Sequence, residues 1–323
     1  MRTATDRRDR RRRGARWRSQ PGADAGGKPM NPRVALLGTG IMGAGMAERL
    51  LDRGFAVDVW DRTPAATARL ADRGASAHAD AAEAVRNADV VITMLPTGDV
   101  LENVMIGHGA LAAIPANAVW AQMGTIGLDA TDRLVAEVAE RRADVAFVDA
   151  PVSGTRDPAR TGQLTVLASG PDAAQGTLQP VLAALGQHVL WLGPAGQGTR
   201  MKLVLNTWLA FEVEAAAEVS AAAHRLDISY KTLLDAVQGG PLASGTALAR
   251  LAKMEHADHS PQFPLEWGLK DLDLVAAATG SETVPVAVAI ADRWRNLVGE
   301  GLGRLDVSAA RFGLTADDPQ PQR

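Results

Sequence analysis

The chain of 323 residues contains no cysteine. This absence excludes disulfide bonds, thiolate metal sites and a cysteine nucleophile, and it suits a reducing compartment, so we expect a cytoplasmic protein. No apolar run reaches the roughly 18 residues that a membrane-spanning helix needs, and no G-x-S-x-G motif predicts a hydrolase nucleophile. Redox chemistry in such a chain would require a bound cofactor.

Lysine is also scarce, because only five of the 34 lysine and arginine residues are lysines: Lys28, Lys202, Lys231, Lys253 and Lys270. Arginine stays protonated in proteins, whereas a buried lysine can lower its pKa and exchange a proton. Lys202 lies in the apolar stretch "TRMKLVLNTWLAF", with Asn206 four residues later on the same face of a predicted helix. We interpret the pair as a candidate catalytic lysine and its orienting amide. The alternative is a lysine whose stem lies along apolar surface.

Positive charge is concentrated at the start of the chain. Residues 1–29 contain nine arginines and Lys28 against three aspartates, although the whole chain has a net charge of -3. We predict a disordered basic extension over residues 1–30; a targeting or nucleic-acid-binding arm is the alternative. The remainder is acidic, which disfavours nucleic acid as a partner. The tail is predicted over residues 311–323, and its final stretch "TADDPQPQR", which is polar and proline-rich, is expected to be loose.

From Arg33 onward, short apolar runs alternate with helical stretches, which predicts β-α-β units and a parallel sheet. The strand candidates are "RVALLG", "FAVDVWD", "ADVVITMLP", "AVWAQM", "VAFVDAP", "QLTVLASG" and "HVLWLG". Beyond residue 192 the pattern becomes helical throughout. We therefore predict an α/β Rossmann-type N-terminal domain over residues 31–194 and an all-α C-terminal domain over residues 195–310. A long interdomain helix over residues 197–226 would join them.

The first apolar run leads into a glycine-rich loop, "GTGIMG", which consists of Gly38, Thr39, Gly40, Ile41, Met42 and Gly43. In a G-x-G-x-x-G loop between a strand and a helix, the first glycine permits the tight turn and the second lets a pyrophosphate approach the backbone. The third lets helix and strand pack closely. With its flanking strand and helix, the loop predicts dinucleotide binding.

The residues after the second predicted strand bear on which dinucleotide binds. Asp61 stands where a carboxylate accepts hydrogen bonds from the adenine ribose, which favours NAD. Arg62 and Thr63 could instead hold the 2'-phosphate of NADP. The residues alone leave both cofactors open.

Five ordered motifs resemble the β-hydroxyacid dehydrogenase family, typified by 3-hydroxyisobutyrate dehydrogenase. They are "GTGIMGAGMAERL", "DVVITMLPT", "FVDAPVSGTRDPARTGQL", "GQGTRMKLVLN" and "FPLEWGLKDLDL". The resemblance spans about residues 32–305. "SGTRDPA", together with Leu205 before Asn206, is most similar to the glyoxylate and succinic semialdehyde reductase branch. That branch uses NADPH and has Asn-Arg-Thr at the three positions where this chain has Asp61, Arg62 and Thr63.

The resemblance implies roles for the residues in these motifs. Lys202 would be the catalytic lysine and Asn206 its companion, and a substrate carboxylate would bind the loop of Ser153, Gly154 and Thr155. Such proteins are NAD(P)-dependent dehydrogenases or reductases of small hydroxy acids and semialdehydes. Self-association through the helical domain, as a homodimer or homotetramer, is also implied.

Further cofactor contacts are implied for Leu95, Pro96, Thr97, Thr125 and Lys270. Gly124 replaces a serine of the family, which removes one hydroxyl contact. Lys270 and Asp271 could alternatively be a surface charge pair.

Two other functions stay open at this point. An imine reductase has a related architecture but typically replaces the lysine, so Lys202 argues against it. A non-catalytic dinucleotide-binding protein could use the basic extension on DNA. We predict no metal site, because His256 and His259 have no evident third ligand. Trp208 is expected to be a core or domain-contact residue.

Overall fold

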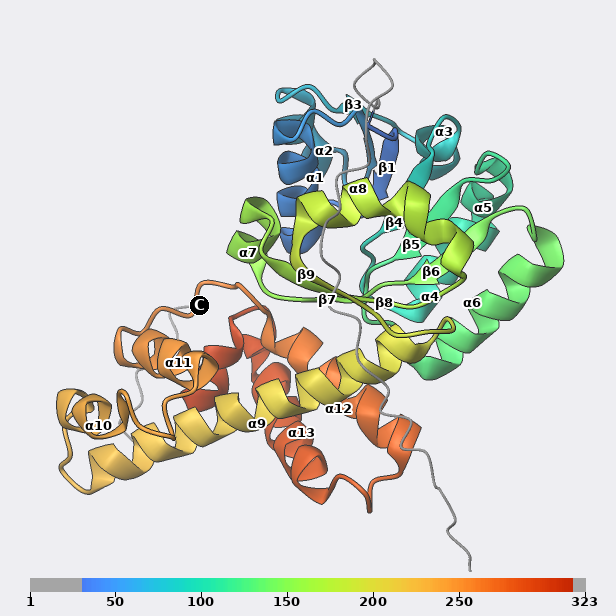
Figure 1. Ribbon diagram of the computed structural model, residues 1–323. Helices are drawn as coiled ribbons and strands as arrows, with labels where there is room; N and C mark the ends of the chain where they lie inside the picture. Colours follow the sequence, from blue (N-terminus) through green and yellow to red (C-terminus); the bar gives the residue numbers. More distant parts are fainter. Residues whose placement is uncertain (1–30, 316–323) are drawn as a thin grey trace, which may run out of the picture. The chain divides into compact units, whose positions relative to one another are not determined.

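The computed structural model describes residues 31–315, so the predicted extension over residues 1–30 and the end of the tail lie outside it. The described chain begins with a parallel sheet covered by helices and continues into helices (Figure 1). Within residues 31–315, no helix is long and apolar enough to cross a membrane.

The predicted parallel sheet is confirmed and has six strands in the order β3-β2-β1-β4-β5-β6. Their bounds are β1 Val34–Leu37, β2 Val57–Trp60, β3 Ser76–Ala77, β4 Val90–Thr93, β5 Val119–Gln122 and β6 Ala146–Asp149. Strand β1 pairs with both β2 and β4, so the chain reverses its direction of sheet growth there. In such a sheet, ligands bind beside the carboxyl ends of the strands at the point of reversal.

Both faces of the sheet are buried, which explains its nearly continuous apolar strands. Val34 and Leu36 face a core shared with α1 (Ile41–Asp52), α2 (Pro64–Ala71) and α8 (Gln175–Leu185). Ala35 and Leu37 face an opposite core. That core includes α3 Ala81–Val85, α4 Gly98–Glu102, the π-helix Asn103–Gly107, α5 Ala110–Ala113 and α6 Leu128–Arg141.

The last two strand candidates form strands, but they belong to a separate three-stranded sheet of order β7-β8-β9. Its members are β7 Val152–Ser153, β8 Leu164–Ala168 and β9 Gly186–Trp191. Strand β7 runs antiparallel to β8. From β6 the chain continues through Pro151 into β7 without changing direction, because Asp149 bridges Ser169 and Val152 pairs with Val166 in one antiparallel register. Helix α7 (Arg156–Thr161) joins β7 to β8, and a 3-10 helix over Asp172–Ala174 precedes α8.

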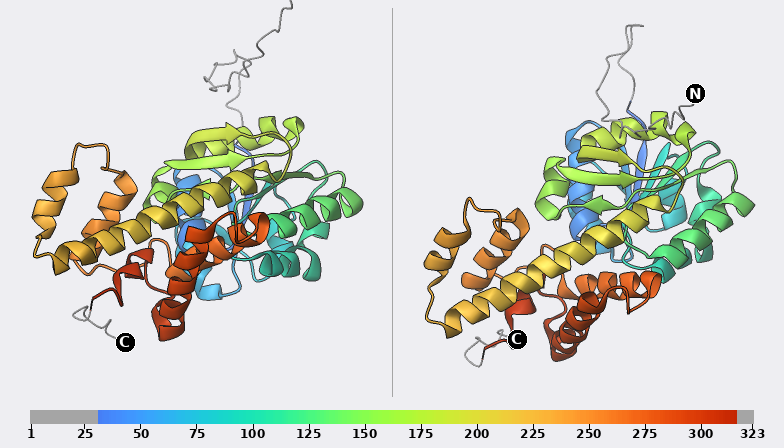
Figure 2. Two further views of the ribbon diagram at one scale, coloured as in Figure 1. Left: turned by 90° about the horizontal axis from the view of Figure 1, so that it is seen from below. Right: turned by 60° about the horizontal axis from the view of Figure 1, so that its bottom comes forward.

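The predicted interdomain helix is α9, Gln197–Arg225, which follows positive-φ turns at Gly193 and Gly196. It extends from the β8–β9 sheet along the C-terminal helices (Figures 1 and 2). Those helices are α10 Tyr230–Val237, α11 Gly245–Glu255, α12 Leu265–Thr279 and α13 Pro285–Leu297, followed by a π-helix over Val298–Leu302 and a 3-10 helix over Val307–Arg311. They share one hydrophobic core with α9, centred on residues such as Val213, Leu272 and Trp294.

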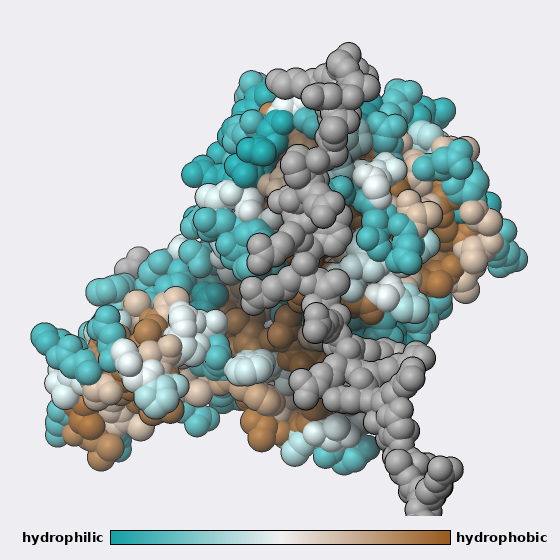
Figure 3. Space-filling view, viewed as in Figure 1, coloured by the Kyte–Doolittle hydropathy of each residue, from teal (hydrophilic) through white to brown (hydrophobic). Residues whose placement is uncertain are grey.

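Two expectations require correction. Trp208 is not a core residue of the described chain, because 64% of its surface is exposed. It lies on a face of α9 with Met201, Val204 and Phe211, and Figure 3 shows apolar surface on the side of the molecule along which α9 runs. The predicted tail also begins too early, because Phe312 packs into the helical core.

Candidate active site

A cleft of about 840 Å³ lies between the carboxyl ends of the parallel strands and helices α9 and α12. Most of the predicted site residues line it: Gly38, Gly40, Ile41, Met42, Gly43, Asp61, Arg62, Leu95, Pro96, Thr97, Thr125, Gly154, Lys202, Asn206 and Lys270. Thr63, Ser153 and Thr155 adjoin these residues in the chain but do not line the cleft. The tertiary structure thus brings five separate sequence motifs together.

The glycine-rich loop joins β1 to α1 at the carboxyl end of β1, where the direction of sheet growth reverses. Gly38 has a φ of +98°, and a Cβ there would lie 2.5 Å from the Met94 carbonyl oxygen. At Gly43 a Cβ would lie 1.9 Å from the Gly38 carbonyl oxygen. The protein itself therefore requires both glycines, the first for its backbone conformation and the second for helix-to-loop packing.

Gly40 is different, because it is exposed and a Cβ there would have no atom of the described chain within 4 Å. Its φ of -66° is one that any residue adopts. The fold gives no reason for a glycine at this position, so the open space above its backbone fits a ligand that approaches closely. Gly40 is also the N-cap of α1, where a phosphate would meet free N–H groups. The loop therefore fits a dinucleotide pyrophosphate.

Asp61 follows β2 and is held by the protein. Its Oδ2 accepts a hydrogen bond from the Thr39 N–H at 2.8 Å, and its Oδ1 accepts one from the Thr63 N–H at 2.9 Å. These bonds fix the carboxylate beside the glycine-rich loop, on the wall of the cleft. A carboxylate has about four lone-pair positions, so acceptor capacity remains for a ligand hydroxyl.

Lys202 is buried on α9, with only 9% of its surface exposed, although it lines the cleft. Burial lowers the pKa of its ammonium from 10.5 to about 8; the nearby Asp271 carboxylate partly opposes the shift and the Lys270 charge adds to it. A lysine with this pKa can both donate and accept a proton near neutral pH. The alternative of a lysine snorkelling to solvent does not fit this burial.

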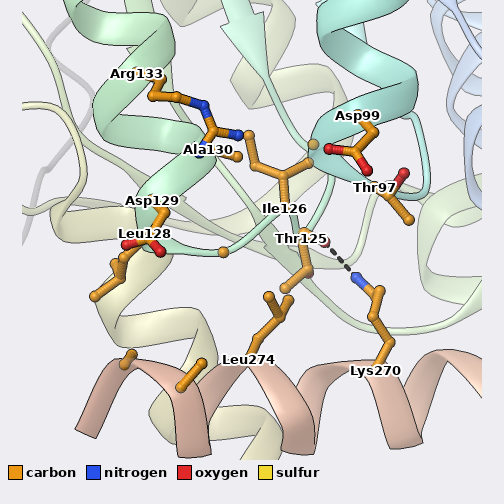
Figure 4. A pocket seen from close by; sticks show the side chains of 14 residues that line it. Thr97, Asp99, Thr125, Ile126, Leu128, Asp129, Ala130, Arg133, Lys270 and Leu274 are labelled. Atoms are coloured by element: carbon orange, nitrogen blue, oxygen red, sulfur yellow. Dashed lines mark hydrogen bonds between the residues drawn. The ribbon is translucent and has the colours of Figure 1, made fainter.

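Asn206 is also buried, and its Nδ2 donates a hydrogen bond to Asp271 Oδ2. Asp271 Oδ1 lies 2.9 Å from Lys270 Nζ. That ammonium in turn donates to the Thr125 carbonyl oxygen, which joins α12 to the loop after β5 (Figure 4). The pair of Lys270 and Asp271 is therefore not a surface charge pair, since Asp271 is only 4% exposed. The position of Asp271 in "LKDLDL" did not reveal that it would hold Asn206.

Other lining residues were not predicted as site residues. Phe263 lies in the loop before α12, Trp267 lies in the first turn of α12, and Val152 lies in β7. They add apolar side chains to the lining of the cleft. Phe263 and Trp267 belong to the "FPLEWGLKDLDL" motif, so the resemblance contained a signal for them that the side-chain chemistry alone did not.

A smaller cavity of about 270 Å³ adjoins the cleft and is bordered by α4, α6 and α12 (Figure 4). The two cavities share Thr97, Asp99, Thr125 and Lys270. Lys270 reaches from α12 toward Thr125 at their boundary (Figure 4). This lysine therefore closes one side of the main cleft.

Gly154 lines the cleft between β7 and α7 with a φ of +136°, and a Cβ there would lie 2.8 Å from Leu164. Thr155 is the N-cap of α7. Of the loop over residues 153–155, only Gly154 lines the cleft, and it presents backbone there. Gln122 fixes the neighbouring loop, because its side-chain amide donates to the Gly124 carbonyl and accepts from the Gly124 N–H, both at 2.8 Å.

The two histidines considered as metal ligands have other contacts. His256 packs edge-on against Tyr230, and His259 Nδ1 lies 2.9 Å from Ser308 Oγ. Among residues 31–315, no group of three or more possible ligand side chains could hold a metal ion.

Two family models match the chain over nearly all of its described length. Residues 33–193 match the NAD binding domain of 6-phosphogluconate dehydrogenase, and residues 196–311 match the NAD-binding model of NADP-dependent 3-hydroxyisobutyrate dehydrogenase. Glyoxylate/succinic semialdehyde reductase 1 of Arabidopsis thaliana is 34% identical over 280 residues, which cover 85% of this chain and 96% of that protein.

Solved structures agree with this result. The Mycobacterium tuberculosis 3-hydroxyisobutyrate dehydrogenase with L-serine superposes with a TM-score of 0.79 at 30% identity, covering 89% of this chain and 100% of that chain. An imine reductase from Pseudomonas sp. has a TM-score of 0.56 at 22% identity, covering 87% and 98% of the two chains, and so shares the fold. From its matched motifs, its two family models and its relatives, the chain belongs to the β-hydroxyacid dehydrogenase family of NAD(P)-dependent oxidoreductases, typified by 3-hydroxyisobutyrate dehydrogenase.

Proposed function

We propose that the protein reversibly transfers a hydride between NAD(H) and a small hydroxy acid or the corresponding semialdehyde, with Lys202 as the proton donor and acceptor. The observation that carries the proposal is a buried lysine with a lowered pKa in the same cleft as a dinucleotide loop. In this proposal, residues 31–194 bind the dinucleotide, and residues 195–310 provide the substrate and dimerisation domain.

In this reaction, residues of the cleft and of the adjoining loop would have separate tasks. When bound, the nicotinamide supplies or accepts the hydride at its C4. The Lys202 ammonium hydrogen-bonds the substrate oxygen, stabilises its developing negative charge and gives it a proton; in oxidation the neutral amine takes the proton back. Asn206, held by Asp271, orients the substrate oxygen. Ser153 and the amides of Gly154 and Thr155 receive the substrate carboxylate.

The cofactor end of the cleft would be formed by residues that point to different parts of the dinucleotide. Gly38, Gly40 and Gly43, with Ile41 and Met42, would hold the pyrophosphate, and Leu95, Pro96, Thr97, Thr125 and Lys270 would line the nicotinamide half. Asp61 would accept the adenine ribose hydroxyls. Because two backbone N–H groups fix its negative charge, we propose that NAD is preferred over NADP, whose 2'-phosphate would be repelled. Arg62 is exposed on the same rim.

Asp61→Asn tests this preference. The amide removes the fixed negative charge, so we expect the ratio of kcat/KM for NADPH to that for NADH to rise roughly 10- to 100-fold, about 1.4–2.8 kcal/mol. Arg62→Ala in the Asp61→Asn background should reverse the gain, since the guanidinium would then carry the phosphate contact. A wild-type enzyme that already prefers NADPH would contradict the proposed preference.

The lowered pKa of Lys202 predicts opposite pH profiles for the two directions. Carbonyl reduction needs the ammonium, so its kcat/KM should fall as the pH rises through about 8, whereas alcohol oxidation needs the amine and should rise over the same range. Because the folded-state pKa lies below the unfolded value of 10.5, the free energy of unfolding should also increase between about pH 8 and 10.5. Initial rates and denaturant unfolding across pH 6–11 measure both. If both pH profiles had their midpoint near pH 10.5, burial would not lower the pKa of Lys202 in the protein.

The substrate class is tested by following oxidation of NADH and NADPH with glyoxylate, succinic semialdehyde, methylmalonate semialdehyde and a cyclic imine. We expect turnover of at least one of the three aldehydes and little of the imine. Turnover of the imine alone would favour the imine reductase function instead.

We further propose that the protein is a homodimer, or a homotetramer of two such dimers, that associates through α9. Met201, Val204, Trp208 and Phe211 recur at spacings of three and four residues on one exposed face of this helix. This spacing is that of a helix that packs against another helix. A second copy of the same chain is the simplest occupant, because a two-fold axis would bury both faces at once. With no cysteine in the chain, we also propose a cytoplasmic location.

Trp208→Glu tests this interface by placing a charge at its most exposed large side chain. We expect the mass measured by light scattering to fall to half that of the wild-type assembly, or to that of one chain. Leu242→Glu is the matched control, because Leu242 is 78% exposed but belongs to the loop between α10 and α11 and not to α9. A wild-type protein with the mass of one chain would exclude the interface.

A further inference from the structure

Asp149 is a buried carboxylate at the end of β6 that contacts α9 rather than the cleft. Its Oδ2 accepts hydrogen bonds from the N–H groups of Gly196 at 3.1 Å and Thr199 at 2.8 Å, and its Oδ1 accepts one from Thr199 Oγ1 at 2.7 Å. The first N–H groups of a helix have no partner within the helix, and the N-cap Gly196 has no side chain to supply one. Asp149 therefore caps α9 from a different element.

The first turn of α9 is fixed to the sheet by further contacts. Ser169, which follows β8, donates to Asp149 through its hydroxyl and accepts a hydrogen bond from the Gly198 N–H at 2.9 Å. A Cβ at Gly198 would lie 2.2 Å from the Leu167 carbonyl oxygen. The helix thus starts in direct contact with strand backbone, where little rotation or translation is possible.

Asp149 also precedes the loop that we propose for the substrate carboxylate. Its own chain continues through Pro151 into β7 and Gly154, and the next N–H, of Ala150, donates to the Gln122 carbonyl oxygen at 2.8 Å. The Asp149 side chain accepts hydrogen bonds from Thr199, which lies less than one helical turn before Lys202 on α9. One residue therefore joins the two elements that would hold opposite ends of the substrate.

We propose that Asp149 is a positioning residue that fixes the distance between the loop over residues 153–155 and the Lys202 ammonium. The inference rests on the proposed function, in which that loop receives the carboxylate and Lys202 serves the reacting oxygen. Displacement of a reacting group by about 1 Å can reduce the rate about 100-fold. A cap that prevents such displacement acts on catalysis without contact with the substrate.

Asp149→Asn tests the proposal, because it keeps the shape but removes the negative charge that holds the N–H groups of Gly196 and Thr199, and its N–H₂ group takes the place of Oδ1 opposite the Thr199 hydroxyl. We expect kcat to fall roughly 10- to 100-fold, with the dinucleotide Kd changed less than about threefold because the glycine-rich loop is untouched. The deuterium isotope effect with reduced cofactor labelled at C4 should rise, since hydride transfer becomes slower than the other steps. Amide hydrogen exchange over residues 197–203 should accelerate.

Glu214→Gln is the matched control. Like Asp149, Glu214 is a buried carboxylate. It lies on α9, 12 residues beyond Lys202, and accepts hydrogen bonds from Arg293 and Trp294 of α13. This variant should lower stability and leave kcat of the folded enzyme within about twofold. An equal loss of kcat in both variants would show that Asp149 serves general stability, and would overturn the proposal.

A second pair of variants covers the case in which Asp149→Asn does not fold. Thr199→Val removes the hydroxyl bond to Asp149 and keeps the side-chain shape, so kcat should fall, and Thr199→Ser should restore it. Wild-type kcat in Thr199→Val would overturn the positioning role. If the wild-type enzyme turns over no substrate of the panel, the proposed function fails; unchanged hydrogen exchange in Asp149→Asn or Thr199→Val then separately overturns the capping role.

Discussion

Replacement of Lys202 by alanine or arginine is expected to reduce turnover about 10²- to 10⁴-fold, the usual contribution of a general acid or base. Alanine removes the proton donor. Arginine keeps a positive charge but does not exchange its proton at these pH values. Dinucleotide affinity should change little in either variant, because the glycine-rich loop lies between β1 and α1 whereas Lys202 is on α9. Steady-state rates with the best substrate, and titration of intrinsic fluorescence with NADH, measure the two effects.

The control for this prediction is Lys202→Met, which keeps the apolar stem of the side chain. Burial lowers the pKa of Lys202, so the folded state bears the cost of a desolvated ammonium at neutral pH. Lys202→Met should therefore be inactive but at least as stable toward denaturant as the wild type. Substantial turnover in Lys202→Arg would contradict the proton-transfer role, whatever the stability of the variants.

Two alanine substitutions in the glycine-rich loop should have opposite consequences. Gly43→Ala places a Cβ 1.9 Å from the Gly38 carbonyl oxygen, and backbone must move to accommodate it. We expect it to lower the free energy of unfolding by about 1–3 kcal/mol or more, with binding lost as the loop shifts. Gly40→Ala meets no atom of the described chain, so its stability should match the wild type while dinucleotide affinity falls tenfold or more.

Chemical denaturation and NADH titration on the same preparations separate these effects. Each variant is the control for the other, since both add one methyl group to the same loop three residues apart. Wild-type NADH affinity in Gly40→Ala would mean that the pyrophosphate does not approach the backbone there, and the proposed binding mode would be wrong.

Much of this fold could be predicted because its signals are local. The alternation of apolar runs and helical stretches predicted the parallel sheet, and the end of that alternation near residue 192 predicted the helical C-terminal part. The second sheet was not separable from the first by pattern, because β8 and β9 are apolar strands like the others. Their assignment depends on the long-range pairing of β8 with β7 and β9, which sequence spacing does not encode.

The sequence by itself determined the family and predicted the dinucleotide loop and Lys202 with Asn206 as a candidate functional pair, since these follow from residue types at short spacings. Only the tertiary structure decided that Asp271 holds Asn206, that Asp149 caps α9 and that Trp208 is exposed. Each of these depends on which residues, distant in the chain, face a given side chain. Packing between the sheet and the helices sets those neighbours, and with them burial, the pKa of Lys202 and the alignment of the cleft.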